Sequence, residues 1–143
     1  MNDYDGLKLD NQLCFSVYAC SREIIKLYKP FLTKLDITYT QYITLLVLWE
    51  KPKITAKELG EKLYLDSGTL TPLLKKLESK ELITRKRSTK DERIMIVTLT
   101  DKGRELKDAA VEIPEKVFCE TQLNIEEAVR LKDSLTKLLN KIT

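Results

Sequence analysis

The sequence contains three cysteines, Cys14, Cys20 and Cys119. Their reactivity depends on their surroundings, because only the ionised thiolate reacts readily with oxidants. None of the three belongs to a CxxC pair, and the chain contains no histidine. A zinc cluster and histidine-based acid–base catalysis are therefore disfavoured, and we expect no metal and no cofactor. In a reducing compartment such thiols stay free unless one of them is a redox site.

Cys14 is the cysteine with a physical reason to react. Asp10 or Asn11 can cap a helix that runs to about Leu32, which would place Cys14 in the first helical turn. The unpaired N–H groups and the dipole at that end favour an anion and hence the thiolate. The alternative is that Cys14 is inert, the usual role of a helical cysteine among apolar residues. Cys20 has no helix end near it and is interpreted as structural.

Tyrosine hydroxyls could stabilise the same thiolate by hydrogen bonding. Tyr28 follows Cys14 by fourteen residues, which is about 21 Å along a straight helix. It can therefore reach a Cys14 only in a second subunit. The predicted helix also carries apolar residues on two adjoining stripes, too many for an isolated surface helix. Both features predict a homodimer in which this helix packs against the other chain.

The middle of the chain is basic. Residues 51–93 contain twelve Lys and Arg against seven Asp and Glu, whereas the remainder contains thirteen against fifteen. This distribution favours a local polyanion-binding surface, and the alternative is an ordinary mixed-charge surface. No apolar run is long enough to span a membrane. The acidic, polar start shows no secretory signal, so we expect a cytoplasmic protein.

Apolar periodicity predicts the elements that position these residues. Capping boxes at Thr38 and Thr55 precede two short helices. Pro72 leaves two starts open for a third, either Thr71 as the cap or a start near Ser67 with a kink at the proline. The predicted order is helices over 10–32, 40–50, 56–63 and 67–80, strands over 82–87 and 94–99, a helix from Thr100 toward Cys119 that Pro114 bends, and a final helix capped by Asn124.

This order predicts a mainly α fold with a small β-hairpin wing (α+β), that is, a winged helix-turn-helix with N- and C-terminal dimerisation helices. We interpret 1–143 as a single winged-helix domain. Within it, 38–100 would form the DNA-binding winged helix-turn-helix, and 10–37 and 101–143 would form the dimerisation helices.

The third short helix and the hairpin carry the candidate DNA-binding residues. The helix presents Ser67, Thr69, Thr71, Lys75 and Lys76 on positions that its leucines do not use, and the hairpin adds Arg85, Lys86, Arg87, Lys90 and Arg93. Small hydroxyls allow close approach to base edges, lysines neutralise phosphates, and an arginine on a projecting wing suits the minor groove. Asp91 is placed to orient the Arg93 guanidinium. The alternatives are a solvated amphipathic helix and a wing charged only for solubility.

At these residues the sequence resembles the multiple antibiotic resistance regulator (MarR) family. The matching stretches are LGEKL at 59–63, LDSGTLTPLLKKL at 65–77, DER at 91–93 and LT at 99–100. The resemblance implies a winged-helix homodimer that represses by occupying a palindromic operator in double-stranded DNA. It also implies that Asp91 and Arg93 are the wing pair, with Arg93 in the minor groove.

A narrower resemblance is to the organic hydroperoxide resistance regulator (OhrR) branch and its staphylococcal-type redox-sensing relatives. LDNQLC at 9–14, Tyr18, LYKP at 27–30 and TYTQ at 38–41 carry it. It implies that Cys14 is the peroxide-reactive thiol, that tyrosines matching Tyr28 and Tyr39 hydrogen-bond it from the partner subunit, and that Tyr18 lies nearby.

The same branch suggests a role for Cys119. Some relatives carry a second cysteine in the C-terminal region that forms an intersubunit disulfide after the first cysteine is oxidised. By position Cys119 matches that resolving thiol, which would give a Cys14–Cys119 disulfide between subunits. The alternative is that a small thiol forms a mixed disulfide with oxidised Cys14.

The resulting hypothesis is a repressor, not an enzyme, whose operator affinity falls when Cys14 is oxidised by organic hydroperoxide. One alternative is a MarR-type regulator that responds to a small phenolic or aromatic ligand without cysteine chemistry. Another is a thiol peroxidase, which the lack of histidine and of an electrophile-binding cluster around Cys14 disfavours. A third is a winged-helix module used only for protein contacts, which would bind DNA weakly and without salt dependence.

Overall fold

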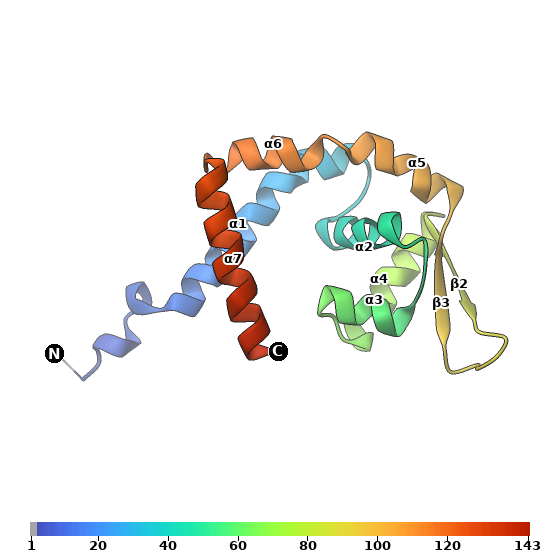
Figure 1. Ribbon diagram of the computed structural model, residues 1–143, viewed down its shortest axis with the longest axis horizontal. Helices are drawn as coiled ribbons and strands as arrows, with labels where there is room; N and C mark the ends of the chain where they lie inside the picture. Colours follow the sequence, from blue (N-terminus) through green and yellow to red (C-terminus); the bar gives the residue numbers. More distant parts are fainter. Residues whose placement is uncertain (1–2) are drawn as a thin grey trace. The chain divides into compact units, whose positions relative to one another are not determined.

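The computed structural model describes residues 3–143 (Figure 1). Two short 3-10 helices, Asp5–Leu7 and Leu9–Asn11, precede the main elements. These are α1 (Leu13–Lys34), α2 (Tyr39–Glu50), β1 (Lys53–Thr55), α3 (Ala56–Leu63), α4 (Ser67–Ser79), β2 (Ile83–Arg87), β3 (Met95–Leu99), α5 (Asp101–Ala110), α6 (Ile113–Glu120) and α7 (Ile125–Ile142). None of these helices combines the length and hydropathy needed to cross a membrane. The chain divides into two compact units, Met1–Val111 and Glu112–Thr143.

α1 begins later than the sequence predicted. Its first residue is Leu13 and Gln12 occupies the N-cap position, so the prediction that Asp10 or Asn11 caps the helix is wrong. Both of those residues belong to the second 3-10 helix instead. Cys14 still lies in the first turn of α1, as predicted.

Side-chain hydrogen bonds to the preceding backbone explain the shift. The Gln12 amide Nε2 donates to the carbonyl oxygens of Gly6 and Lys8, at 2.7 and 2.8 Å. The Asn11 amide Nδ2 donates to the carbonyl oxygen of Asp5 at 2.8 Å. These amides fasten the 3-10 helices to the start of α1, and no side chain caps the first N–H groups of the helix.

The first unit contains a winged helix-turn-helix. Its antiparallel sheet has the strand order β1-β3-β2, in which β2 and β3 form the predicted hairpin (Figure 1). β1 pairs with the other edge of β3, with Ile54 opposite Val97. The sequence reasoning missed β1, because a three-residue strand gives no alternating pattern to recognise. The mainly α fold with a β-hairpin wing is confirmed.

The helices of this unit begin at polar caps. The capping box predicted at Thr38 is present, with its hydroxyl accepting from the Gln41 N–H at 3.3 Å. Asp66 caps α4 by accepting from the Thr69 N–H at 2.7 Å. α4 therefore starts at Ser67 with Pro72 in its interior, which is the second of the two starts that the sequence left open.

Leucines of α2, α3 and α4 and residues of the wing strands form the core. Each of these side chains exposes less than 2% of its surface: Leu45, Leu48, Leu59, Leu77, Ile83 and Val97. Burial of these apolar side chains supplies the main stabilisation and fixes α4 against β2. The opposite face of α4 is left in solvent.

α5 packs tightly against the base of the wing. A Cβ atom at Gly103 would lie 2.4 Å from the carbonyl oxygen of Leu82 and 2.6 Å from Leu99 Cδ1, so only glycine fits there. The Gly103 carbonyl accepts a hydrogen bond from Trp49 Nε1 at 2.9 Å. This contact joins α2, α5 and the wing into one body.

The second unit consists of α6 and α7. The sequence predicted a single bent helix from Thr100 toward Cys119, but the structure has two helices, because α5 ends at Ala110 and α6 starts at Ile113. Pro114 lies in the first turn of α6, where its missing N–H costs little. The capping box predicted at Asn124 is present at the start of α7.

Candidate functional site

The exposed face of α4 carries the hydroxyls and lysines expected of a DNA-reading helix. Ser67, Thr69, Thr71, Lys75 and Lys76 are all exposed. The leucine stripe of the same helix, which consists of Leu70, Leu73, Leu74 and Leu77, is buried. The helix thus separates a core face from a polar face, as its sequence predicted.

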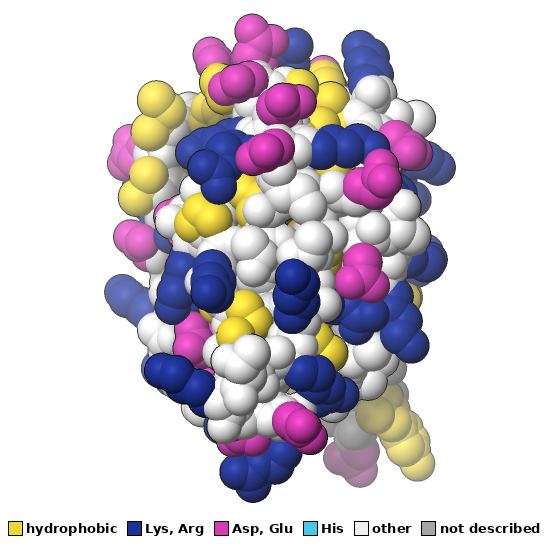
Figure 2. Space-filling view, turned by 90° about the vertical axis from the view of Figure 1, so that its right-hand side faces the viewer, with side chains coloured by type: hydrophobic (Ala, Val, Ile, Leu, Met, Phe, Trp, Pro, Cys, Tyr) yellow, Lys and Arg dark blue, Asp and Glu magenta, His cyan; other side chains and the backbone are white. Residues whose placement is uncertain are grey.

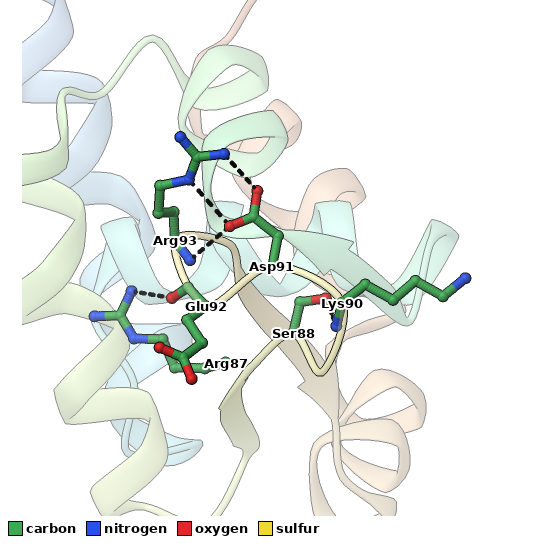
Figure 3. A network of polar contacts seen from close by, with 6 residues as sticks. All are labelled: Arg87, Ser88, Lys90, Asp91, Glu92 and Arg93. Atoms are coloured by element: carbon green, nitrogen blue, oxygen red, sulfur yellow. Dashed lines mark hydrogen bonds and ion pairs between the residues drawn. The ribbon is translucent and has the colours of Figure 1, made fainter.

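The wing tip is a network of polar contacts that holds one arginine out in solvent (Figure 3). The carboxylate of Asp91 accepts from Nε and Nη2 of Arg93, both at 3.1 Å, and from the Arg93 backbone N–H at 3.0 Å. The Arg93 side chain nevertheless remains 90% exposed. The guanidinium beside it holds the pKa of Asp91 below its ordinary value. Asp91 therefore stays ionised and keeps the guanidinium pointing outward.

Two further wing cations lie around this pair. Arg87 donates from Nη1 to the carbonyl oxygen of Glu92 at 3.1 Å, and the Lys90 side chain extends away from the network on the other side of the loop (Figure 3). Lys86 is exposed on β2. These side chains leave positive charge on both sides of the wing tip.

Arg85 is placed differently from the other wing cations. Its side chain is only 17% exposed, and its Nη2 donates to Oε1 of Glu78 in α4 at 3.1 Å. Its Nε is buried and has no hydrogen-bond partner among the described residues. Arg85 therefore joins β2 to α4, a contact that the sequence did not indicate, and its role at DNA stays a prediction.

α4, which we call the reading helix, and the wing border the same surface. A groove of about 890 Å³ lies between α3, α4 and the wing, with Ser67, Thr71 and Lys75 on α4 and Arg87 on β2 among its lining residues. Figure 2 views the molecule from the wing side. It shows Lys and Arg side chains gathered over the lower half of this face, at the level of the wing tip, where Asp and Glu are sparser. Helix and wing therefore border one groove, to which α4 contributes Lys75 and β2 contributes Arg87.

Cys14 is exposed and its sulfur has no hydrogen-bond partner within the described chain. Tyr18 lies one turn further along α1, and its hydroxyl accepts from Nη1 of Arg22 at 3.1 Å and makes no hydrogen bond to Cys14. α1 is continuous from Leu13 to Lys34, so about 21 Å of helix separates Cys14 from Tyr28 of the same chain.

Tyr28 and Tyr39 come together away from Cys14. Their ring centroids are 4.9 Å apart, and Tyr42 lies 5.7 Å from Tyr28 and 6.3 Å from Tyr39. Burial raises the pKa of each of the three hydroxyls. They therefore remain protonated donors at neutral pH. The sequence reasoning missed Tyr42, although its spacing of three from Tyr39 on one helix was a usable signal.

The remaining cysteines are also exposed and unpaired. Cys20 lies on α1, and Cys119 lies in the last turn of α6, in the second unit. Residues 3–143 contain no cluster of three or more Cys, Asp or Glu side chains able to hold a metal ion.

Comparisons with known proteins identify a family and several relatives of this chain. A family model described as transcriptional regulator SarA/Rot matches residues 26–110. The organic hydroperoxide resistance transcriptional regulator of Bacillus subtilis (strain 168) is 52% identical over 141 residues, which cover 99% of this chain and 96% of that protein. The HTH-type transcriptional regulator SarZ of Staphylococcus saprophyticus is 47% identical over 133 residues, which cover 93% of this chain and 91% of that protein.

A solved structure has the same fold as this chain. The structure of reduced AbfR bound to DNA, a protein of Staphylococcus epidermidis, has a TM-score of 0.79 to this chain at 36% identity and covers 99% of both chains. The two sequence relatives are named as transcriptional regulators, and AbfR is bound to DNA in its solved structure. The chain belongs to the SarA/Rot family of transcriptional regulators and is a MarR-type winged-helix protein of the organic hydroperoxide resistance regulator branch.

Proposed function

We propose that the protein is a cytoplasmic, homodimeric repressor that binds a palindromic operator and releases it when organic hydroperoxide oxidises Cys14. The observation that carries the redox part is the separation of Cys14 from the Tyr28–Tyr39 pair within one chain. Cys14 has an exposed, unpartnered sulfur, and the tyrosines are protonated donors that lie about four helical turns away. Only a second subunit can bring the two halves together.

The exposed apolar stripes support the dimer. On α1, Leu13, Phe15, Val17, Ile24 and Ile25 expose 39–71% of their surface, and α7 has no buried residue. The exposed apolar residues of α7 are Ile125, Val129, Leu131, Leu135, Leu138, Leu139 and Ile142. Stripes of this size on both terminal helices are typical of an obligate interface. In the dimer, Tyr28 and Tyr39 of the partner subunit would donate hydrogen bonds to the Cys14 thiolate.

DNA recognition would use α4 and the wing together. The two α4 helices of the dimer would enter successive major grooves, with Thr69, Thr71 and Ser67 at base edges and Lys75 and Lys76 at phosphates. Arg93, held by Asp91, would enter the minor groove, while Lys86, Arg87 and Lys90 would neutralise phosphates. Arg85 would act on DNA indirectly, by holding β2 against Glu78 of α4.

The redox step consumes one peroxide for each reactive thiolate. The Cys14 thiolate attacks one peroxide oxygen, the O–O bond breaks, and the alkoxide leaves and takes up a proton as the alcohol. The resulting sulfenic acid condenses with a second thiol, which forms a disulfide and releases water. That second thiol would be Cys119 of the partner subunit or a small cellular thiol. The new disulfide displaces the tyrosines. The two α4 helices of the dimer, each with its wing, then lose the spacing that fits the operator.

A mixed dimer tests the shared site. A Cys14→Ser chain lacks the thiol, and a chain with both Tyr28→Phe and Tyr39→Phe lacks the donors, so each homodimer should react poorly with peroxide. In the mixed dimer, the remaining Cys14 faces the intact tyrosines of the other chain. We expect this dimer to recover about half of the wild-type reactive sites at the wild-type rate. If Cys14 in the mixed dimer reacts with peroxide no faster than in the homodimer that carries Tyr28→Phe and Tyr39→Phe, the tyrosines act on the cysteine of their own chain and the proposal is refuted.

A further inference from the structure

Lys80 connects the end of the reading helix to the helix that carries Tyr39. It is the residue that follows the last turn of α4. Its half-buried side chain donates from Nζ to Oε1 of Gln41 at 3.0 Å and to the carbonyl oxygen of Asp36. Both acceptors lie about forty residues earlier in the sequence, Asp36 in the turn between α1 and α2 and Gln41 in the first turn of α2. The contact therefore belongs to the tertiary structure and not to the cap of α4.

Gln41 already serves the start of α2. Its side chain is 2% exposed, and the same Oε1 atom accepts from the Thr38 backbone N–H at 3.1 Å. Tyr39 lies inside this capping box, between Thr38 and Gln41, with its ring 4.9 Å from that of Tyr28. One buried oxygen thus holds both the first turn of the tyrosine-bearing helix and the end of α4. A displacement of this turn would stretch the bond to Lys80.

α5 holds the other side of the same connection. The carbonyl oxygen of Lys80 accepts from Lys102 Nζ at 3.0 Å, and that of Glu81 accepts from the Thr100 hydroxyl at 2.7 Å. The turn between α4 and β2 is therefore fastened to the base of the wing. Because this turn is fastened, it cannot absorb a movement of the α1–α2 turn by rearranging its own backbone. The movement would instead shift α4. Lys76, one helical turn before Lys80, lies on the exposed face of α4.

We propose that Lys80 is a positioning residue that couples the Tyr28–Tyr39 pair to the reading helix through Gln41. This proposal rests on the proposed function, since it assumes that oxidation of Cys14 displaces those tyrosines. Lys80 contacts neither the thiol nor, in its role here, the operator. It transmits the displacement because its hydrogen bonds span the two elements that must move together.

The test compares Lys80→Met with a matched control, Lys102→Met. Each variant removes a lysine ammonium that makes a hydrogen bond at the turn between α4 and β2, but only Lys80→Met removes the bonds to Gln41 and Asp36. Operator Kd is measured for wild type and both variants, reduced and after one equivalent of cumene hydroperoxide, on a duplex selected by reduced wild type. Mass spectrometry of the Cys14 peptide confirms that each protein is oxidised. We expect the ratio of oxidised to reduced Kd to be roughly tenfold smaller in Lys80→Met than in wild type. In Lys102→Met the ratio should stay close to that of wild type, because the Thr100 hydroxyl and backbone N–H still bond the carbonyl oxygens of Glu81 and Leu82 and fasten the turn.

Other outcomes separate the possible failures. A wild-type ratio in Lys80→Met, or an equal loss in both variants, overturns the coupling role. A salt dependence of reduced binding that falls by about one ion per subunit would identify Lys80 as a phosphate contact and also overturn it. If Lys80→Met does not bind the operator when reduced, Lys80→Gln, with a shorter polar side chain, carries the same prediction. An oxidised wild type that keeps its operator affinity refutes the proposed function itself, and the coupling with it.

Discussion

Substitution of Gly103 by alanine should destabilise the protein, because α5 meets the base of the wing there without room for a side chain. The added Cβ would lie 2.4 Å from the carbonyl oxygen of Leu82 and 2.6 Å from Leu99 Cδ1. Overpacking of this kind costs about 1–3 kcal/mol. Displacing α5 would also weaken the Trp49 hydrogen bond to the Gly103 carbonyl, a loss of about 1 kcal/mol. Alanine regains about 1 kcal/mol of helix propensity, so the net loss is about 1–3 kcal/mol.

Urea unfolding at fixed protein concentration measures this change, because the stability of a dimer depends on concentration. The matched control is Gly68→Ala in α4, where the new Cβ would meet only Asp66 Oδ1, at 3.4 Å. The control should gain up to about 1 kcal/mol from helix propensity. If Gly103→Ala unfolds at the same urea concentration as Gly68→Ala, the close approach between α5 and Leu82 is not present in solution.

Three other predictions follow from the site. Arg93→Ala should weaken operator binding, measured by fluorescence anisotropy, by roughly tenfold or more without changing the melting temperature. Asp91→Asn should weaken operator binding less. If Arg93→Ala binds the operator as tightly as wild type, the wing arginine does not contact the DNA. The double substitution Tyr28→Phe and Tyr39→Phe should slow the reaction of the Cys14 thiol with peroxide by roughly tenfold or more, whereas Tyr42→Phe should not change its rate. The rate is measured as the disappearance of free thiol after peroxide is added. Asp66→Ala should lower the melting temperature by a few degrees at neutral pH, because the carboxylate caps α4.

The pH dependence of the last effect has a definite sign. Hydrogen bonds from the Thr69 N–H and hydroxyl hold the pKa of Asp66 below its ordinary value of 3.8. A lowered carboxyl pKa contributes stability above the ordinary value and loses it as the pH falls through the lowered value. The difference in melting temperature between wild type and Asp66→Ala should therefore close under acid. A difference that persists there would mean that the cap does not depend on the charge.

Local signals made much of the fold predictable. The capping boxes at Thr38 and Asn124 and the buried leucine stripe of α4 depend on residues three or four apart, and the structure has them where the sequence placed them. The polar face of α4 followed from the same periodicity. The Asp91–Arg93 bond was predictable for the same reason, since its partners are two residues apart.

The features that sequence reasoning missed depend on distant partners. β1 exists because β3, more than forty residues later, offers it an edge. The start of α1 is set by the Gln12 amide, which bonds backward to the 3-10 helices and so displaces the expected caps. Arg85 turns inward because Glu78 of α4 lies beside β2, which no pattern within the wing reveals. Each of these contacts is fixed by packing and not by spacing along the chain.

The central claim is that oxidation of Cys14 lowers operator affinity, and one measurement tests it most directly. Operator Kd is determined for wild type and Cys14→Ser, each before and after one equivalent of organic hydroperoxide. We predict that peroxide raises the Kd of wild type by at least about tenfold and leaves that of Cys14→Ser unchanged. Equal affinities in all four samples would contradict the claim, leave the DNA-binding surface standing, and turn the search for the signal to a small phenolic or aromatic ligand.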